Sequence, residues 1–264
     1  MVHPLSILLI PATAFIANRA STIYSRLNIP YPITLNRDVP TTLSNHRTVT
    51  SIINPSKLPA LSDTHEIVIP WPRTPEGGTM PNEQVLARLC YGFFGGIVLT
   101  PERTLLGFLR KNLIGISALD AVAVPQEIWS RGDLPPEKAL EVGSKLYGTF
   151  QVVDQHIAPS PTAAADSKAL FDEESFVTFA YGYDEGLFKG AHRFYVSQAQ
   201  PPASSSTQNR EKKWVRLRMS STNVVTSDSP YMQKAMDWSG SFHLTYANLL
   251  FRDAVAEVLS PYEQ

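Results

Sequence analysis

The chain has 264 residues, of which 43% are hydrophobic and 18% are charged, and its formal net charge is -1. This composition is too apolar for a disordered chain and supplies enough nonpolar residues for a large core. Because the charges nearly balance, the sequence gives no support for a nucleic-acid partner. The single cysteine, Cys90, excludes an internal disulfide, and we expect a reducing, cytoplasmic environment.

The first 27 residues allow two interpretations. Residues 5–17 are apolar like the centre of a signal peptide, but no Lys or Arg precedes them and they are too short for a membrane span. From Pro11 onward, apolar residues recur at helical spacing, with Arg19 and Arg26 on the polar side. The segment is therefore either an ordered amphipathic helix or a targeting segment that makes peripheral membrane contact through residues 1–27.

Residues 28–79 are rich in Pro, Thr, Ser and Asn and contain one predicted strand at 65–69, which Pro70 ends. We interpret residues 1–79 as an extension that packs on a domain formed by residues 80–264.

Two helices are predicted next. The first begins at Pro81 and ends at Gly95-Gly96, with four inward-facing residues: Val85, Leu86, Leu89 and Phe93. The second has Thr100 as its N-cap and ends at Gly115, with a predicted buried stripe of Leu105, Leu106, Leu109 and Leu113. A short helix is expected around residues 136–142.

The hydrophobic period then changes from helical to alternating, which predicts strands at 146–153, 176–183, 191–197 and 214–223. A long amphipathic helix over residues 229–259 closes the chain, because Asp228 can cap it and Pro230 suits its first turn. Its apolar surface is wide enough to require cover on two sides.

Four segments carry a resemblance to a known superfamily: Leu99-Thr-Pro-Glu-Arg with Leu-Arg-Lys-Asn112, Tyr147-Gly-Thr-Phe150, Gly182-Tyr-Asp with His192-Arg-Phe-Tyr-Val-Ser197, and Phe242-His-Leu-Thr-Tyr-Ala-Asn-Leu-Leu-Phe251. With the order of the predicted elements, residues 80–259 resemble the helix-grip fold of START-like (SRPBCC) and birch-pollen-allergen-like proteins. The resemblance implies an α+β fold in which a curved antiparallel sheet wraps a long C-terminal helix and leaves a ligand cavity between them. The similar branch supplies no activity to transfer.

No H-E-x-x-H, C-x-x-C, P-loop or G-x-S-x-G motif is present, so we expect no metal site and no cofactor. Chemistry is therefore expected from side chains alone. On a helix-grip fold, His243 lies at the cavity wall close to Tyr246, and His192 alternates with Phe194 and Val196. An imidazole in such a wall can transfer protons, or it can be a core histidine bonded to a neighbour.

Candidate ligand contacts are Tyr181, Tyr183, Phe242, Arg110 and Asn112. The tyrosines can equally stack across the sheet, and Arg110 equally suits the negative end of its helix.

The preferred hypothesis is a small-molecule pocket protein: a cofactor-independent cyclase, isomerase or dehydratase of specialised metabolism that acts on a hydrophobic substrate, with His243, His192 and Tyr246 as catalytic residues. The alternatives are a non-catalytic carrier or sensor of lipid-like ligands, and a structural domain with a filled core. An enzyme requires ionisable groups that converge in one site, whereas the site of a carrier is almost wholly apolar.

Overall fold

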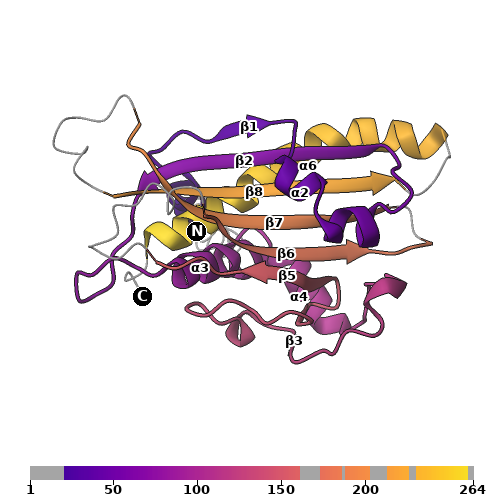
Figure 1. The fold of residues 1–264 in the computed structure, drawn as a ribbon, viewed down its shortest axis with the longest axis horizontal. Coiled ribbons are helices and arrows are strands. Elements are labelled where there is room, and N and C mark those ends of the chain that lie inside the picture. The colour runs from indigo at the N-terminus through magenta and orange to yellow at the C-terminus, as the bar shows by residue number, and fades with distance from the viewer. Residues whose placement is uncertain (1–20, 161–172, 186–187, 203–212, 226–229, 261–264) are drawn as a thin grey trace, which may run out of the picture.

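The protein is described by a computed structural model that covers residues 21–160, 173–185, 188–202, 213–225 and 230–260, with the side chains of the last helix described from residue 243 onward. Within these residues the fold is α+β, with one curved, unclosed, eight-stranded sheet (Figure 1). Its strand order is β1-β2-β8-β7-β6-β5-β4-β3, and every pairing is antiparallel except that of β3 with β4.

The strands are β1 (Thr34–Asn36), β2 (Ala60–Pro70), β3 (Glu127–Ile128), β4 (Lys145–Leu146), β5 (Phe150–His156), β6 (Ser175–Gly182), β7 (Phe188–Ala199) and β8 (Trp214–Val225). The helices are α2 (Thr41–Ser44), α3 (Asn82–Gly95), α4 (Thr100–Leu109) and α6 (Pro230–Leu259), with a π-helical turn at Thr48–Ile53 and 3-10 turns at Ser117–Leu119 and Arg131–Asp133. Three of the four alternating segments predicted after residue 145 are confirmed as β6, β7 and β8, whereas the strand predicted at 146–153 is divided by a turn at 147–149 into β4 and β5.

The first long strand pairs with the last one. β2 runs antiparallel to β8 from the pair Ala60–Val224 to the pair Pro70–Trp214. Strands β1 and β2 precede residue 80, yet they belong to the same sheet as the later strands. The proline-rich extension therefore contributes two strands to the sheet as well as covering it.

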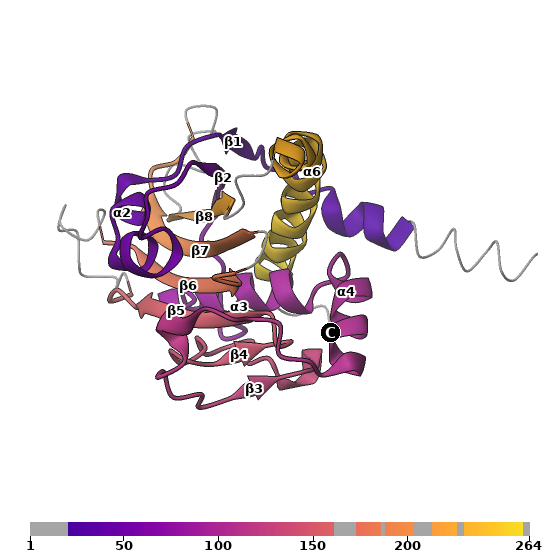
Figure 2. The same ribbon diagram turned by 90° about the vertical axis from the view of Figure 1, so that its right-hand side faces the viewer.

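The sheet lies between two layers (Figure 2). Helices α3 and α6 cover the concave face, where the largest apolar core gathers around Phe93, Phe94, Phe179, Phe194 and Phe251. Helix α2 and the π-helical turn cover the opposite face.

Because the second face is covered, the residues of β7 that alternate with His192 are buried as well. Arg193 is 1% exposed, and its guanidinium contacts Asp154 at 3.1 Å and Thr178 at 2.6 Å. A buried cation requires such partners, because its desolvation is otherwise uncompensated.

Helix α3 forms as the sequence predicts, and it crosses α6 closely. At Gly92 an added Cβ would lie 2.6 Å from the Cβ of Glu257 and 2.7 Å from the Cα of Ala254. Only glycine allows two helices to approach so tightly at this point.

The prediction of a buried stripe on the second helix is wrong, as are its end at Gly115 and the helix around 136–142. No residue of α4 is buried, and Leu105 and Leu109 are exposed. The helix faces the protein through Leu106 and Gly107, and it ends at Leu109 because Arg110 adopts a left-handed conformation with φ 47°. Residues 136–142 form bends and turns.

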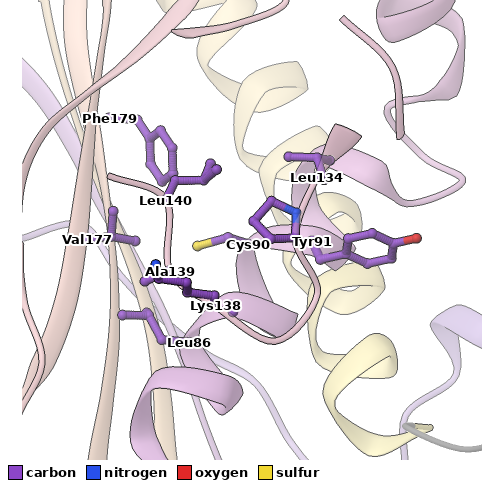
Figure 3. Close-up of a pocket in the computed structure, with 11 residues that line it drawn as sticks. Leu86, Cys90, Tyr91, Leu134, Lys138, Ala139, Leu140, Val177 and Phe179 are labelled. Carbon is purple, nitrogen blue, oxygen red and sulfur yellow. The ribbon is translucent and has the colours of Figure 1, made fainter. Parts of the chain in front are cut away.

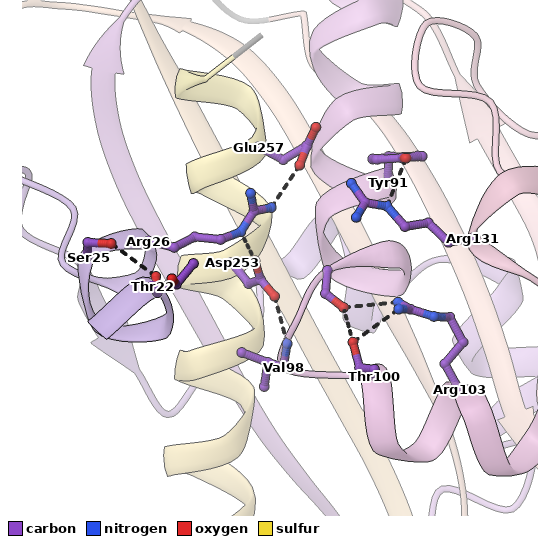
Figure 4. A network of polar contacts seen from close by, with 11 residues as sticks. Thr22, Ser25, Arg26, Tyr91, Val98, Thr100, Arg103, Arg131, Asp253 and Glu257 are labelled. Atoms are coloured by element: carbon purple, nitrogen blue, oxygen red, sulfur yellow. Dashed lines mark hydrogen bonds and ion pairs between the residues drawn. The ribbon is translucent and has the colours of Figure 1, made fainter. Parts of the chain in front are cut away.

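The long closing helix is confirmed as α6, and it has cover on two sides. Its buried residues Phe251, Val255 and Val258 belong to the core shared with α3 and the sheet. On another side, helical residues 21–27 lie against it through Arg26, which contacts Asp253 at 2.5 Å and Glu257 at 2.7 Å (Figure 4). The described part of the N-terminal segment is therefore an ordered helix, and residues 1–20 lie outside the described residues.

Candidate functional site

A row of polar side chains crosses the concave face of the sheet. Because side chains alternate along a strand, Asp63 and His65 share the face of Ile67 and Ile69 on β2. The register places Asp63 opposite Ser221 on β8, and Ser221 opposite His192 on β7. Three neighbouring strands thus bring Asp63, Ser221 and His192 side by side.

The Asp63 carboxylate is buried between imidazole rings. Asp63 is 2% exposed, its Oδ2 lies 3.2 Å from Nδ1 of His65, and its Oδ1 lies 3.6 Å from Nε2 of His243 on α6. Burial alone raises the pKa of this carboxyl, but the adjacent His243 and His65 rings outweigh burial and hold the pKa well below its ordinary value. Asp63 is therefore ionised at neutral pH.

His192 is held in an aromatic environment. Its ring stacks on that of Tyr181 with 4.7 Å between centroids, and the rings of Phe93 and Phe150 lie around it. Its Nδ1 lies 2.8 Å from the hydroxyl oxygen of Ser221. Burial lowers the pKa of His192 to about 3, with a further contribution from His243, so the ring is neutral at physiological pH.

Tyr181 continues the polar row toward the end of the sheet. Its hydroxyl donates a hydrogen bond to the side-chain oxygen of Asn223 on β8. Between them lies Gly190 of β7, where an added Cβ would be 2.5 Å from the Tyr181 hydroxyl oxygen. Burial raises the pKa of Tyr181, which keeps the phenol protonated and able to donate.

Together these residues form a polar group that we call the Asp63 cluster: Asp63, His65, Tyr181, His192, Ser221, Asn223 and His243. On one side the concave face continues into buried apolar residues such as Met219 and Phe194. On the other side it ends at Leu61 and Phe188, which are exposed. The cluster thus separates a dry core from an exposed apolar rim.

The structure brings three of the predicted site residues together, namely His243, His192 and Tyr181. Tyr246 lies elsewhere, because its hydroxyl donates to Glu102 of α4 at 2.6 Å. Tyr183 follows the end of β6 and is 39% exposed. Phe242 belongs to α6, but its side chain lies outside the described residues.

The two polar candidates after α4 are exposed. Arg110 forms the left-handed C-cap of that helix. In the orientation that satisfies its neighbours, the Asn112 amide donates to the Gly148 carbonyl and accepts from Lys145 Nζ, both at 3.2 Å. These contacts give both residues a local structural role.

Sequence reasoning did not single out Asp63, His65, Ser221 or Asn223. The available signal was the alternation Leu61-x-Asp63-x-His65-x-Ile67, which places two ionisable groups on the apolar face of a strand. Polar residues at apolar-face positions are the informative exception in a core, because each needs a partner or a function.

Two hollows lie away from the cluster. A narrow pocket of about 10 Å³ has Cys90, Leu140 and Phe179 in its wall and has room for about one water molecule (Figure 3). An open groove of about 870 Å³ lies between residues 22–31, Tyr91 and the end of α6, with Arg26 and Arg131 on its walls (Figure 4). Within the described part of the chain, no three His, Cys, Asp or Glu side chains are arranged to hold a metal ion.

No protein-family model matches the sequence, and no curated protein is significantly similar to it. Among the described residues, no helix combines the length and apolarity needed to cross a bilayer. Any functional conclusion therefore depends on the geometry of the chain itself.

Proposed function

We propose that the protein is a cofactor-independent enzyme of helix-grip architecture that moves a proton on a hydrophobic substrate, as a cyclase, isomerase or dehydratase does. The substrate would lie over the Asp63 cluster on the concave face of the sheet, beside the exposed rim residues Leu61 and Phe188. The order β2, α3, α4, further strands and α6, with β2 paired to β8, suits that architecture.

The observation that carries the proposal is the ionised Asp63 carboxylate held beside His243 and His65. Burying a carboxylate costs several kcal/mol unless its partners compensate, and permanent cations compensate better than imidazoles. Imidazoles have the advantage that they gain and lose protons near neutral pH. A carrier of lipid-like ligands needs no such group, so the cluster favours proton transfer over carriage.

The geometry suggests how protons move. Nε2 of His243 lies 3.6 Å from Oδ1 of Asp63, a distance that must shorten to a hydrogen bond when the substrate binds, and in this proposal Nδ1 of His243 acts as the base. When Nδ1 takes a proton from the substrate, the negative Asp63 stabilises the imidazolium. Return of that proton to another substrate atom gives isomerisation, and its transfer to a leaving hydroxyl gives dehydration.

A substrate-independent test uses nitrobenzisoxazole, whose ring opens when a base in an apolar site removes its one acidic C–H proton. We expect the purified protein to accelerate this elimination, and His243→Gln and Asp63→Asn to lose at least about tenfold of the rate, since positioned bases contribute roughly 100-fold or more. His156→Gln, which changes an exposed imidazole on β5, is the matched control and should keep the rate.

Elimination at the same rate in wild type, His243→Gln and Asp63→Asn would contradict the proposal. Mass spectrometry of small molecules that co-purify with the protein then separates the remaining functions. A co-purifying lipid that is released from the protein chemically unchanged would indicate a carrier.

A further inference from the structure

The hydroxyl of Ser221 determines which nitrogen of His192 carries its proton. Ser221 is fully buried, and among the described residues His192 Nδ1, at 2.8 Å, is the one acceptor its hydroxyl has. If Nδ1 carried the proton, the Ser221 O–H would have no acceptor within this part of the chain, and an unpaired buried donor costs about 1–3 kcal/mol. Ser221 therefore donates to Nδ1, and the proton of the neutral ring resides on Nε2.

Among the described residues, the hydrogen bond of the His192 ring is the one at Nδ1, and none is found at Nε2. The ring is 8% exposed and fixed by its stack on Tyr181 and by the rings of Phe93 and Phe150. It belongs to the same cluster as His243, whose charge influences it. A fixed neutral donor in an apolar site, next to a carboxylate-backed base, is suited to an oxygen atom on which negative charge develops.

We infer that the substrate is a carbonyl compound with an acidic α C–H bond, and that His192 donates from Nε2 to its carbonyl oxygen while His243 removes the α proton. This inference rests on the proposed function and names its substrate class. The C–H bond breaks and its proton goes to Nδ1 of His243. The bonding pair becomes the C=C bond of an enolate, and the former C=O pair moves to the oxygen that His192 holds.

Asp63 and Ser221 are positioning residues in this scheme. Asp63 stabilises the imidazolium of His243, and Ser221 keeps the His192 proton on Nε2. No oxidant, reductant or metal is needed, because the proton returns to carbon or leaves with a β-hydroxyl group.

The test compares two reactions in each protein. Exchange of the α protons of β-tetralone for deuterium, followed by NMR in D2O, needs both the base and the oxygen donor. Nitrobenzisoxazole elimination needs the base, and its N–O bond breaks to leave a phenolate whose charge is delocalised into the nitro-substituted ring, so it depends far less on a hydrogen-bond donor. The ratio of the two rates cancels any loss of folded protein, so it isolates the role of the donor.

We expect wild type to accelerate both reactions. His192→Phe, which fits the aromatic surroundings, should lower tetralone exchange by roughly 100-fold, the usual cost of one oxyanion donor, and change elimination less than about threefold. His192→Gln can place an amide N–H near the position of Nε2 and should restore part of the exchange. Ser221→Ala should lower exchange several-fold relative to elimination, and the 15N shifts of His192 should show a changed tautomer.

Three results would overturn the inference. Equal losses in both reactions for the His192 variants would make His192 a core histidine, and the proposed function would stand without the carbonyl substrate. If wild type accelerates the elimination but not tetralone exchange, the carbonyl substrate is likewise wrong and the proposed function stands. Absence of both reactions in wild type would overturn the inference and the proposed function together.

Discussion

Two buried carboxylate sites in this protein are compensated in different ways. Asp253 and Glu257 of α6 face Arg26, a permanent cation, and Asp253 also accepts a hydrogen bond from the Val98 amide at 2.8 Å (Figure 4). Asp63 is as deeply buried, but it faces the imidazoles of His65 and His243. Arg26 remains a cation at any ordinary pH, whereas an imidazole is a group that can gain or lose a proton. The first therefore suits a structural role and the second suits chemistry.

We expect the largest loss of stability when the ion pairs of Arg26 with Asp253 and Glu257 are removed. Arg26→Ala leaves Asp253 and Glu257 buried without a countercharge, and removal of one partner of a buried ion pair costs about 3 kcal/mol or more. Because Arg26 is partly exposed, we expect a cost at the lower end of that range. Urea unfolding at neutral pH measures it, with Arg37→Ala on the exposed surface as the control. A loss below about 1 kcal/mol would contradict a structural role for the pair.

The contrast between these sites also shows what the sequence can predict. The spacing of apolar residues and the capping residues predicted α3, α6 and the later strands. This works because a helix or strand with one buried face has apolar residues at a regular spacing in its sequence. His192, Tyr181 and His243 could be singled out because each interrupts an apolar pattern. Asp63 was missed because the polar start of β2, Ala60–Thr64, lies outside the strand predicted at 65–69, and His65 was the first residue of that predicted strand.

Long-range pairing explains the rest of what the sequence left undetermined. Asp63 meets Ser221 through the pairing of β2 with β8, and no local pattern encodes a contact between strands so far apart. The wrong prediction of a buried stripe on α4 has a related cause. The spacing of its apolar residues indicated an apolar stripe, but it did not indicate whether another element covers that stripe.

The second prediction concerns the pH dependence of stability that His192 causes. Burial gives His192 a pKa of about 3 in the folded protein, against about 6.5 when unfolded, so the unfolded state binds more protons between these values. Stability therefore falls as pH decreases through this window, and His192 alone should account for about 2 kcal/mol between pH 7 and pH 5. Urea unfolding at both pH values should show this loss in wild type and a loss smaller by that amount in His192→Phe.

The other charged groups that face His192, namely Asp63, His65 and His243, are the same in both proteins, so the difference isolates His192. His156→Gln on an exposed ring should retain the pH dependence of wild type. If His192→Phe loses stability with acid as steeply as wild type, the ring is not held neutral by burial.

The third prediction compares the carboxylates directly. Asp63→Asn preserves shape and leaves no buried charge without a partner, whereas Arg26→Ala leaves two carboxylates without their cation, so we expect a smaller stability loss than for Arg26→Ala, even though activity falls. Urea unfolding of Asp63→Asn and Arg26→Ala, each compared with wild type, measures the two losses in the free energy of unfolding. A cost for Asp63→Asn as large as that for Arg26→Ala would place Asp63 with the structural pair and remove the reason to assign it chemistry.

The smallest expected effect defines where the candidate site ends. Tyr246 and His243 lie within one turn of α6, but the Tyr246 hydroxyl binds Glu102 at 2.6 Å on the exposed α4. Tyr246→Phe removes that bond and should cost about 0.5–1 kcal/mol, since water can replace the lost partner. Because this bond is made to Glu102 of α4, which is not a member of the Asp63 cluster, nitrobenzisoxazole elimination should remain within about twofold of wild type. A larger loss of rate with the same small loss of stability would move Tyr246 back among the groups that touch the substrate, and it would make α4 one wall of the site.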